Sequence, residues 1–222
     1  MIEKYFGITS EKLVQSACET IYMVGISLLI GVVLGGIIAM ILYLTRGDGL
    51  HPNRIIYGIV NGVINIIRST PFIILLVCVM PLTKLIVGTR IGTTAAIVPL
   101  VIYIAPYLAR LIEGSLLEVG HGIVEAAQAM GATTLQILLR FVLPEAFGSI
   151  ALGVTTGTIG LIGATAMAGY IGGGGIGNLA LTYGFQMFNY RLMTFTVIVL
   201  ILFVWLIQTI GNRIAKKRRN HE

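Results

Sequence analysis

The residues best able to do chemistry gather in one stretch of the chain, EAAQAMGATTLQILLRFVLPEA, from Glu125 to Ala146. It holds two glutamates, two glutamines, an arginine and a proline in a sequence that is otherwise mostly Leu, Ile, Val and Gly. Carboxylates catalyse acid–base reactions when they form a close pair or stand beside a nucleophile and a histidine. The sequence contains neither a carboxylate pair of that kind nor a Ser/His/Asp set, so we predict that the chain is not an enzyme.

Metal and nucleotide sites have no support either. The histidines His51, His121 and His221 are isolated, and Cys18 and Cys78 lack the CxxC spacing of a metal site. No lysine follows a glycine run of the GxxxxGK[ST] type, which is the type that cradles ATP phosphates. We therefore predict that the chain binds no metal and no cofactor, and that any ATP is bound by another subunit.

The glycine run GGGGIGN at residues 172–178 matches the dinucleotide-binding pattern GxGxxG only formally. No strand-then-helix unit surrounds Gly172, Gly174 and Gly177, and no acidic residue follows about 20 positions later. We interpret the run as the tight outer end of a membrane span.

The composition is that of a membrane protein. The chain has 222 residues, of which 56% are hydrophobic and only 11% charged, and its mean hydropathy is +0.95. Soluble domains carry about 25% charged residues. The net charge of +6 could suggest nucleic acid, but many of the basic residues lie in loops and at the C-terminus, where a membrane orientation signal places them, so we predict no nucleic-acid binding.

Five apolar segments are long enough to cross a bilayer, which takes about 20 residues. They lie at residues 20–44, 55–82, 92–111, 146–168 and 192–211. Since an open sheet cannot satisfy its backbone in lipid, we predict an all-α integral membrane protein. The second segment is interrupted by Arg68 and Pro71, which leaves an alternative in which Ile55–Ile67 is an interfacial helix and the crossing begins near Arg68.

The basic tail at residues 212–222 predicts a cytoplasmic C-terminus and, with five spans, an external N-terminus. This assignment puts nine Lys and Arg residues inside and five outside. Without the tail the numbers are four and five, so the tail decides the orientation. The stretch that opened this section then lies in a cytoplasmic loop, residues 113–145, inside a transmembrane domain of residues 16–210.

This loop is predicted to contain two short helices. Apolar residues recur at helical spacing at Ile123, Val124, Ala127 and Met130. Gly131 can stop the first helix in a left-handed cap, and a second helix over 134–143 is predicted to end before the proline that follows. The pattern allows two interpretations, a surface that docks a partner or a helix that lies on the lipid headgroups.

Asn61, Asn65 and Arg68 fall on one face of a helix inside the second segment. A charge within a span is costly and usually turns toward protein or a water-filled path. One interpretation is a polar lining of the translocation path. The other, which we favour, is a structural role in which Arg68 bonds carbonyl groups freed around Pro71 or extends to the membrane surface.

The fourth segment carries a stripe of small residues that would let another helix approach closely, within the subunit or across a dimer. The stripe comprises Gly153, Gly157, Gly160 and Ala164. Met167 lies on an adjacent strip, and we predict that it faces the translocation path, with a plain packing or lipid-facing role as the alternative.

The stretch resembles the signature loop of permease subunits in ATP-binding-cassette (ABC) importers. That signature is Glu-Ala-Ala, three residues, Gly, nine residues, Ile, one residue and Leu-Pro, and this chain departs from it only by Phe141 in place of isoleucine. The segments NIIRSTPFIILLV, AAIVPLVIYIAPYLAR and GGGGIGN are similar to the methionine-uptake group of these permeases. The resemblance covers roughly residues 16–210.

The resemblance implies a multi-pass permease of the bacterial cytoplasmic membrane that imports methionine by alternating access, with the enantiomer left open. It further implies a homodimer in the lipid bilayer, two cytoplasmic ATPase subunits that bind ATP and Mg²⁺, and an extracytoplasmic methionine-binding protein. The loop would carry the coupling helix that docks on the ATPase. The residues implied in coupling are Glu125, Ala126, Ala127, Gly131, Leu143 and Pro144.

Two alternatives stay open at this point, a permease for another amino acid and a self-contained secondary transporter. Secondary transporters often show inverted repeats and acidic residues inside their spans. The sequence has no evident internal repeat, and an odd number of spans does not divide evenly. An ATPase that co-purifies with the chain would decide for the importer.

Overall fold

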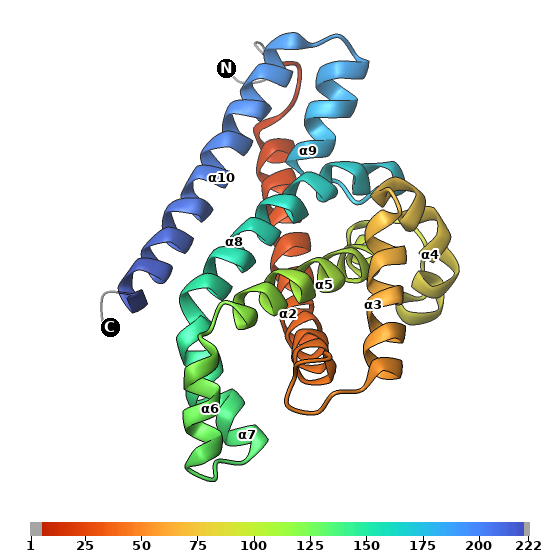
Figure 1. Cartoon of the computed structure of the whole chain (residues 1–222). Helices are drawn as coiled ribbons and strands as arrows, with labels where there is room; N and C mark the ends of the chain where they lie inside the picture. Colours follow the sequence, from red (N-terminus) through yellow and green to blue (C-terminus); the bar gives the residue numbers. More distant parts are fainter. Residues whose placement is uncertain (1–5, 220–222) are drawn as a thin grey trace.

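The computed structural model describes residues 6–219, and every regular element in that part of the chain is helical (Figure 1). The long helices are α2 (Ser10–Thr45), α3 (Arg54–Ser69), α4 (Phe72–Val87), α5 (Thr93–Leu117), α8 (Leu143–Ala168) and α10 (Tyr190–Arg219). The short elements are α6 (His121–Ala129), α7 (Thr134–Gln136), α9 (Ile176–Asn178), the 3-10 turn η2 (Gly169–Ile171) and two π-helical segments, η1 (Ile137–Val142) and η3 (Leu179–Gln186). The predicted all-α class is confirmed.

Four helical stretches are each long and apolar enough to cross a membrane, and they contain the first, third, fourth and fifth predicted spans. They are Ser10–Thr45, Thr93–Leu117, Thr134–Ile171 and Tyr190–Lys216. The helices run past the predicted ends. At 1.5 Å per residue α2 is about 54 Å long, well beyond the roughly 30 Å of hydrocarbon in a bilayer.

The second predicted span, over residues 55–82, is not one straight helix. It is a pair, α3 and α4, bent by 115° at the break between them. Pro71 causes the break, because proline has no N–H to donate and pushes the residue before it out of the helical region. Thr70 accordingly adopts φ −84° and ψ 124°, and its N–H closes the last turn of α3 on the Ile67 carbonyl. The region is therefore two helices divided at Pro71, and the interfacial position of the first one stays a prediction.

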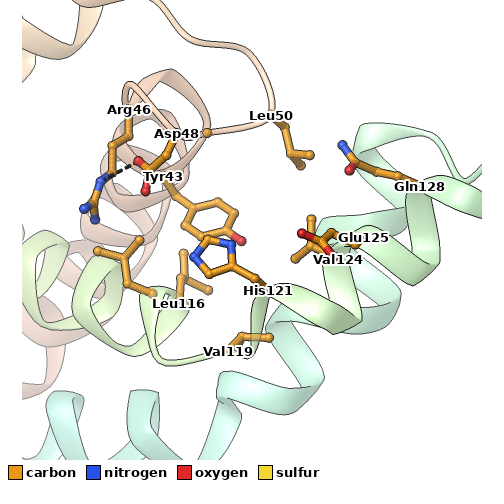
Figure 2. A pocket seen from close by; sticks show the side chains of 12 residues that line it. Tyr43, Arg46, Asp48, Leu50, Leu116, Val119, His121, Val124, Glu125 and Gln128 are labelled. Atoms are coloured by element: carbon orange, nitrogen blue, oxygen red, sulfur yellow. Dashed lines mark ion pairs between the residues drawn. The ribbon is translucent and has the colours of Figure 1, made fainter.

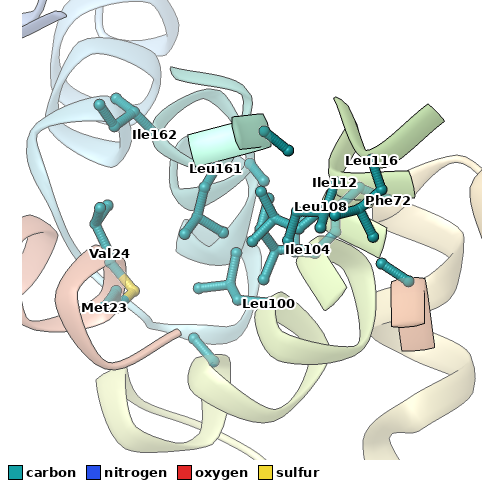
Figure 3. Packing of buried hydrophobic residues seen from close by; sticks show 14 of the residues in the cluster. Met23, Val24, Phe72, Leu100, Ile104, Leu108, Ile112, Leu116, Leu161 and Ile162 are labelled. Atoms are coloured by element: carbon teal, nitrogen blue, oxygen red, sulfur yellow. The ribbon is translucent and has the colours of Figure 1, made fainter. Parts of the chain in front are cut away.

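Helix α5 lies at the centre of the bundle. Leu100, Ile104, Leu108, Ile112 and Leu116 recur every four residues along it and are all buried. They belong to one core cluster with side chains from α2, α4 and α8 (Figure 3). Because lipid is as apolar as leucine, close van der Waals packing rather than water exclusion holds such helices together.

Glycines bring two helices close to α5. A Cβ at Gly35 of α2 would lie 2.8 Å from the Ala105 carbonyl oxygen, and one at Gly157 of α8 would lie 2.5 Å from Leu108 Cδ2. Gly153 stands in the same way against Leu111. The small-residue stripe of α8 thus packs inside the subunit; Ala164 lies in the core, while Gly160 has only the Tyr103 hydroxyl nearby, at 3.9 Å.

We expect Gly157→Leu to lower the thermal midpoint of the detergent-solubilised chain by several degrees, because its side chain meets Leu108. Gly163→Leu is the matched control on the same helix, since a Cβ there has nothing within 4 Å. Both changes raise helix propensity equally. Equal midpoints for the two variants would contradict close packing of α8 on α5.

The chain enters α8 through a π-helical turn. The predicted end of the second loop helix before Pro144 is wrong, because the helix continues from Thr134 through η1 into α8. A proline clashes with the carbonyl four residues earlier, here that of Arg140, and cannot donate to it. The turn absorbs this conflict with a wider i→i+5 bond from the Leu143 N–H to the Leu138 carbonyl.

The two ends of the bundle carry different structures. At the lower end in Figure 1, α6 and α7 project below α5 and α8. At the upper end lie α9 and the turn into α10, where Ile8, Leu179 and Leu192 form a small second core. There Asn189 Nδ2 donates to the Phe6 carbonyl at 2.7 Å. The loop between α5 and α8 therefore lies at one end of the bundle, and the glycine run at residues 172–178 lies at the other.

Candidate functional site

The loop between α5 and α8 is folded around a buried seam. Ala127 of α6 is fully buried, as is Val142 of η1, and Ile137 and Leu138 are nearly so. Ile123 and Val124 pack partly against the same core. The apolar stripe predicted to be exposed on the first helix therefore faces the chain itself, and only Met130, 70% exposed, remains open.

The outer side of α6 presents the signature residues to solvent. Glu125 and Ala126 are exposed, together with Gln128 and Ala129. Ala127 is the exception: the resemblance implied that it contacts a partner, but its methyl group lies in the core. The outer side of α6 is therefore a small-residue face edged by a carboxylate and an amide, and further along the loop Leu135 and Leu139 expose apolar side chains.

Gly131 ends α6 in the left-handed conformation, with φ +76°. The Gly131 N–H donates to the Gln128 carbonyl at 2.9 Å, and the Ala132 N–H donates to the Ala127 carbonyl at 3.1 Å. This pair of bonds is the Schellman motif, which satisfies the last carbonyls of a helix. A Cβ at Gly131 would meet nothing within 4 Å, so this edge of the loop is open.

The next helix begins with a capping box that the sequence analysis overlooked. The Gln136 N–H donates to Thr133 Oγ1 at 3.4 Å, and the Thr133 N–H donates to Gln136 Oε1 at 2.9 Å. The signal was present as Thr-x-x-Gln. Farther along, Leu143 is half-buried and Pro144 is exposed at the start of α8.

A hollow of about 200 Å³ separates α6 from the α2–α3 loop, residues 46–53. Figure 2 shows the side chains around it: Tyr43, Arg46 and Asp48 face Glu125 and Gln128. Arg46 Nε pairs with Asp48 Oδ1 at 2.7 Å. No motif in residues 46–53 had pointed to this arrangement.

A hydrogen bond joins the α2–α3 loop to the second loop helix. His51 Nε2 lies 2.8 Å from Thr134 Oγ1, across 83 residues of sequence. The same loop caps α3, because Asn53 Oδ1 accepts from the N–H groups of Ile55 and Ile56 at 3.1 Å. The two loops therefore form one surface at this end of the bundle.

The polar face of α3 turns toward α5. Arg110 Nη2 donates to Asn61 Oδ1 and, at 3.4 Å, to Asn65 Oδ1. Arg110 Nη1 also pairs with Glu113 Oε2 at 2.7 Å, and Glu113 is only 4% exposed. In the sequence analysis Arg110 entered only as one of the nine basic residues predicted to lie inside. It is instead the centre of a polar cluster that fastens α3 to α5.

Arg68 makes no hydrogen bond to the carbonyl groups around Pro71 in the described part of the chain. Its guanidinium lies over the Tyr107 ring of α5, 5.8 Å from the centroid, a distance at which a cation and a ring attract. The residue is otherwise exposed. It adds to the attachment of α3 to α5, but through an aromatic ring rather than through the carbonyls around Pro71.

The predicted path residue Met167 lies on the open side of α8. It is 41% exposed, and Tyr170, one turn further along, is 68% exposed. Thr156 and Gly163 are exposed on the same side, next to the stripe of small residues on this helix. The strip is available to line a passage or to meet another subunit.

Comparison with known proteins relates the whole chain to one group. Residues 31–217 match the family described as "Binding-protein-dependent transport system inner membrane component". The chain is 46% identical to the "Probable D-methionine transport system permease protein MetI" of Vibrio cholerae over 216 residues, which cover 97% of this chain and 96% of the relative. It is 41% identical to the "Methionine import system permease protein MetP" of Bacillus subtilis, covering 97% of each.

Solved structures agree with these relatives. A structure of the MetNI methionine ABC transporter in an inward-facing conformation matches with a TM-score of 0.91 and 41% identity, over 94% of this chain and 97% of that one. An amino acid ABC transporter crystallised with histidines matches with a TM-score of 0.76 but only 18% identity, which shows a shared fold alone.

Proposed function

Because the chain belongs to the family of binding-protein-dependent transport system inner membrane components, we propose that it is the permease subunit of an ABC importer for methionine. The observation that carries this proposal is the full-length match to the MetNI methionine transporter at a TM-score of 0.91. The chain is a membrane transport subunit and not an enzyme, and a separate ATPase subunit hydrolyses the ATP. A self-contained secondary transporter is set aside by the family.

The match supports assembly with ABC partners. We propose the composition of the complex by analogy with the matched transporter. Two copies of the chain would form a homodimer, each bound to one cytoplasmic ATPase subunit, with an extracytoplasmic protein delivering methionine. Glu125, Ala126 and Gly131 are accessible for the ATPase, and Pro144 lies at the same end. Ala127 and Leu143 would act from within, by holding α6 on the core.

We also propose the orientation with an external N-terminus. The α2–α3 loop, α6 and α7 lie together at one end of the bundle. This is the end that the distribution of Lys and Arg predicts to be cytoplasmic. The glycine run at 172–175 and the contact of Asn189 with Phe6 lie at the other end. The predicted basic tail, 212–222, begins inside α10, and its last residues, 220–222, fall outside the described part of the chain.

Uptake of labelled methionine by a strain that lacks this gene tests the proposal. Restoration by the chain, dependent on ATP and competed by unlabelled methionine but not by histidine, is the expected result. An ATPase subunit should co-purify with a tagged chain. A chain that is present in the membrane with its ATPase but restores no uptake of labelled methionine would place the substrate elsewhere.

For the path, we expect Met167→Trp to lower methionine uptake several-fold without changing the amount of assembled complex. The reason is that Met167 lies on the exposed strip of α8 and is not among the residues of the main core cluster. The measurement is uptake in membranes with matched amounts of permease and ATPase. Leu152→Trp is the matched control, because Leu152 is 42% exposed on the same helix but lies four turns nearer the other end.

A further inference from the structure

At the outer end of the bundle, an acidic residue of the first span is bound by the glycine run. We call Gly172–Gly175 the glycine loop. Gly172, Gly174 and Gly175 all have positive φ, at +70°, +72° and +92°. This backbone turns the N–H groups of Gly175 and of the next residue, Ile176, toward α2.

Two side chains of α2 accept these N–H groups. The Gly175 N–H donates to Glu19 Oε2 at 2.8 Å, and the Ile176 N–H donates to Thr20 Oγ1 at 2.9 Å. Gln15 Nε2 donates to the other carboxylate oxygen of Glu19 at 2.8 Å. Both carboxylate oxygens are therefore used, and 156 residues of sequence separate Glu19 from its backbone partner.

The glycine loop leaves no room for a side chain at these contacts. A Cβ at Gly174 would overlap the Glu19 carboxylate, and a Cβ at Gly175 would lie 2.8 Å from Thr20 Oγ1. The backbone is thus shaped to the two acceptors of α2. The glycine pattern that resembles a dinucleotide motif holds a carboxylate of the same chain.

The loop is also continuous with the outer end of α8. The Gly173 N–H donates to the Ala168 carbonyl at 3.0 Å, and the Gly172 N–H donates to the Gly169 carbonyl at 2.9 Å. The Ile171 carbonyl accepts from the Gly92 N–H, at the start of α5, at 2.8 Å. The loop is therefore bonded to the last turn of α8, which carries Met167, and to η2, which carries Tyr170.

We propose that Glu19, assisted by Thr20, is a positioning residue for transport: it holds the glycine loop, and through it the open strip of α8 at the outer mouth of the path. This inference rests on the proposed function, because it concerns how the permease completes its cycle. Glu19 touches no substrate in this account. It acts through the backbone that it binds.

The test uses the whole complex in lipid nanodiscs and in cells, with three variants. Glu19→Ala removes the charged acceptor, Glu19→Gln keeps an acceptor oxygen of the same reach, and Thr20→Val removes the second acceptor at nearly constant volume. Glu11→Ala is the matched control, since Glu11 is an exposed acid in the first turn of the same helix.

Hydrogen exchange of the peptide spanning 172–178 reports the contact itself, whatever the substrate is. We expect Glu19→Ala to speed this exchange by at least about tenfold, because amides lose a charged acceptor, and Glu19→Gln to restore most of the protection. We expect the maximal rate of methionine uptake to fall at least about fivefold in Glu19→Ala, with KM and complex amount unchanged, and to recover in Glu19→Gln.

Unchanged exchange in Glu19→Ala would overturn the contact. Faster exchange with uptake equal to that of Glu11→Ala would overturn the role in transport and leave a structural contact only. If Glu19→Ala fails to accumulate, hydrogen exchange and uptake are measured on Thr20→Val instead, and the same outcomes decide. A wild-type complex that imports no methionine refutes the proposed function separately, and ATP hydrolysis stimulated by the binding protein then replaces uptake as the readout for Glu19.

Discussion

Replacing Gly131 with leucine is expected to leave the permease in the membrane at near-normal amount while removing most of the bound ATPase and most of the uptake. The chain around Gly131 has room, because a Cβ there meets nothing within 4 Å. The added side chain therefore meets no neighbour at its Cβ within the subunit and extends toward whatever lies outside it. If α6 docks on the ATPase, that neighbour is the ATPase.

Leucine at this position also strains the backbone, and the two effects can be separated. A non-glycine residue in the left-handed conformation costs on the order of 1 kcal/mol, while asparagine tolerates that conformation better. Gly131→Ala adds strain with the least bulk, and Gly131→Asn adds bulk with little strain. We expect bound ATPase to decrease in the order alanine, asparagine, leucine.

A pull-down with tagged permease, probed for the ATPase and for the extracytoplasmic protein, gives the result. The extracytoplasmic protein should bind every variant, since the glycine loop end is untouched. If alanine is as harmful as leucine and asparagine is harmless, the cap matters and the close contact does not. Full retention of the ATPase in the leucine variant and in Glu125→Lys would mean that α6 lies on lipid.

The two-helix loop between α5 and α8 could be predicted from sequence because its signals are local. A glycine after an amphipathic run, at 131, needs only the chain around it to form its cap, and the motif spacing adds to that signal. What the pattern could not give is which side of α6 faces inward. Periodicity alone marks an apolar stripe, and the structure buries most of that stripe, Ala127 included, against η1 and α8.

In the second predicted span, hydropathy averaged over many residues hides the helix break at a single proline. Hydropathy over 55–82 is high enough for one crossing, yet Pro71 and the extended Thr70 divide it at an angle of 115°. The sequence shows Pro71, but it does not show whether the proline breaks the helix or is accommodated within one apolar span. In α4 the chain instead tolerates Pro81 inside a continuous helix, so proline alone does not decide the outcome.

The polar clusters were out of reach of any local pattern. Arg110 meets Asn61 across 49 residues of sequence, and Glu19 meets Gly175 across 156. Their chemistry is plain once the helices are placed, because a charge in a span must find a partner. Only the packing of α3 on α5 and of α2 on the glycine loop determines which partner it finds.

Removing one partner of the Arg110–Glu113 ion pair is expected to destabilise the permease strongly. Glu113 is 4% exposed and lies 2.7 Å from the guanidinium, whose other nitrogen donates to the amides of α3. Removing one partner of a buried pair typically costs about 3–5 kcal/mol, because the other charge is left without compensation. For a chain of this size that corresponds to roughly 6–20 °C in thermal midpoint.

We therefore expect Glu113→Ala to lower the thermal midpoint of the purified permease, and its amount in the membrane, far more than Glu118→Ala. Glu118 is the matched control, since it is exposed near the end of the same helix and its contact, with Ser149 Oγ at 2.6 Å, is exposed as well. A midpoint for Glu113→Ala equal to that of Glu118→Ala would mean that Arg110 is stabilised well enough by Asn61 and Asn65 alone.

The double variant Arg110→Met with Glu113→Leu decides what the pair does. Replacing both partners with apolar residues of similar volume is often neutral or stabilising. We expect the double variant to regain most of the midpoint lost in Glu113→Ala, since no unpaired charge remains and Asn61 and Asn65 still bond to each other at 3.4 Å. If its uptake recovers too, the pair serves only to fasten α3 to α5. A recovered midpoint with uptake still lost would give the pair a part in transport itself.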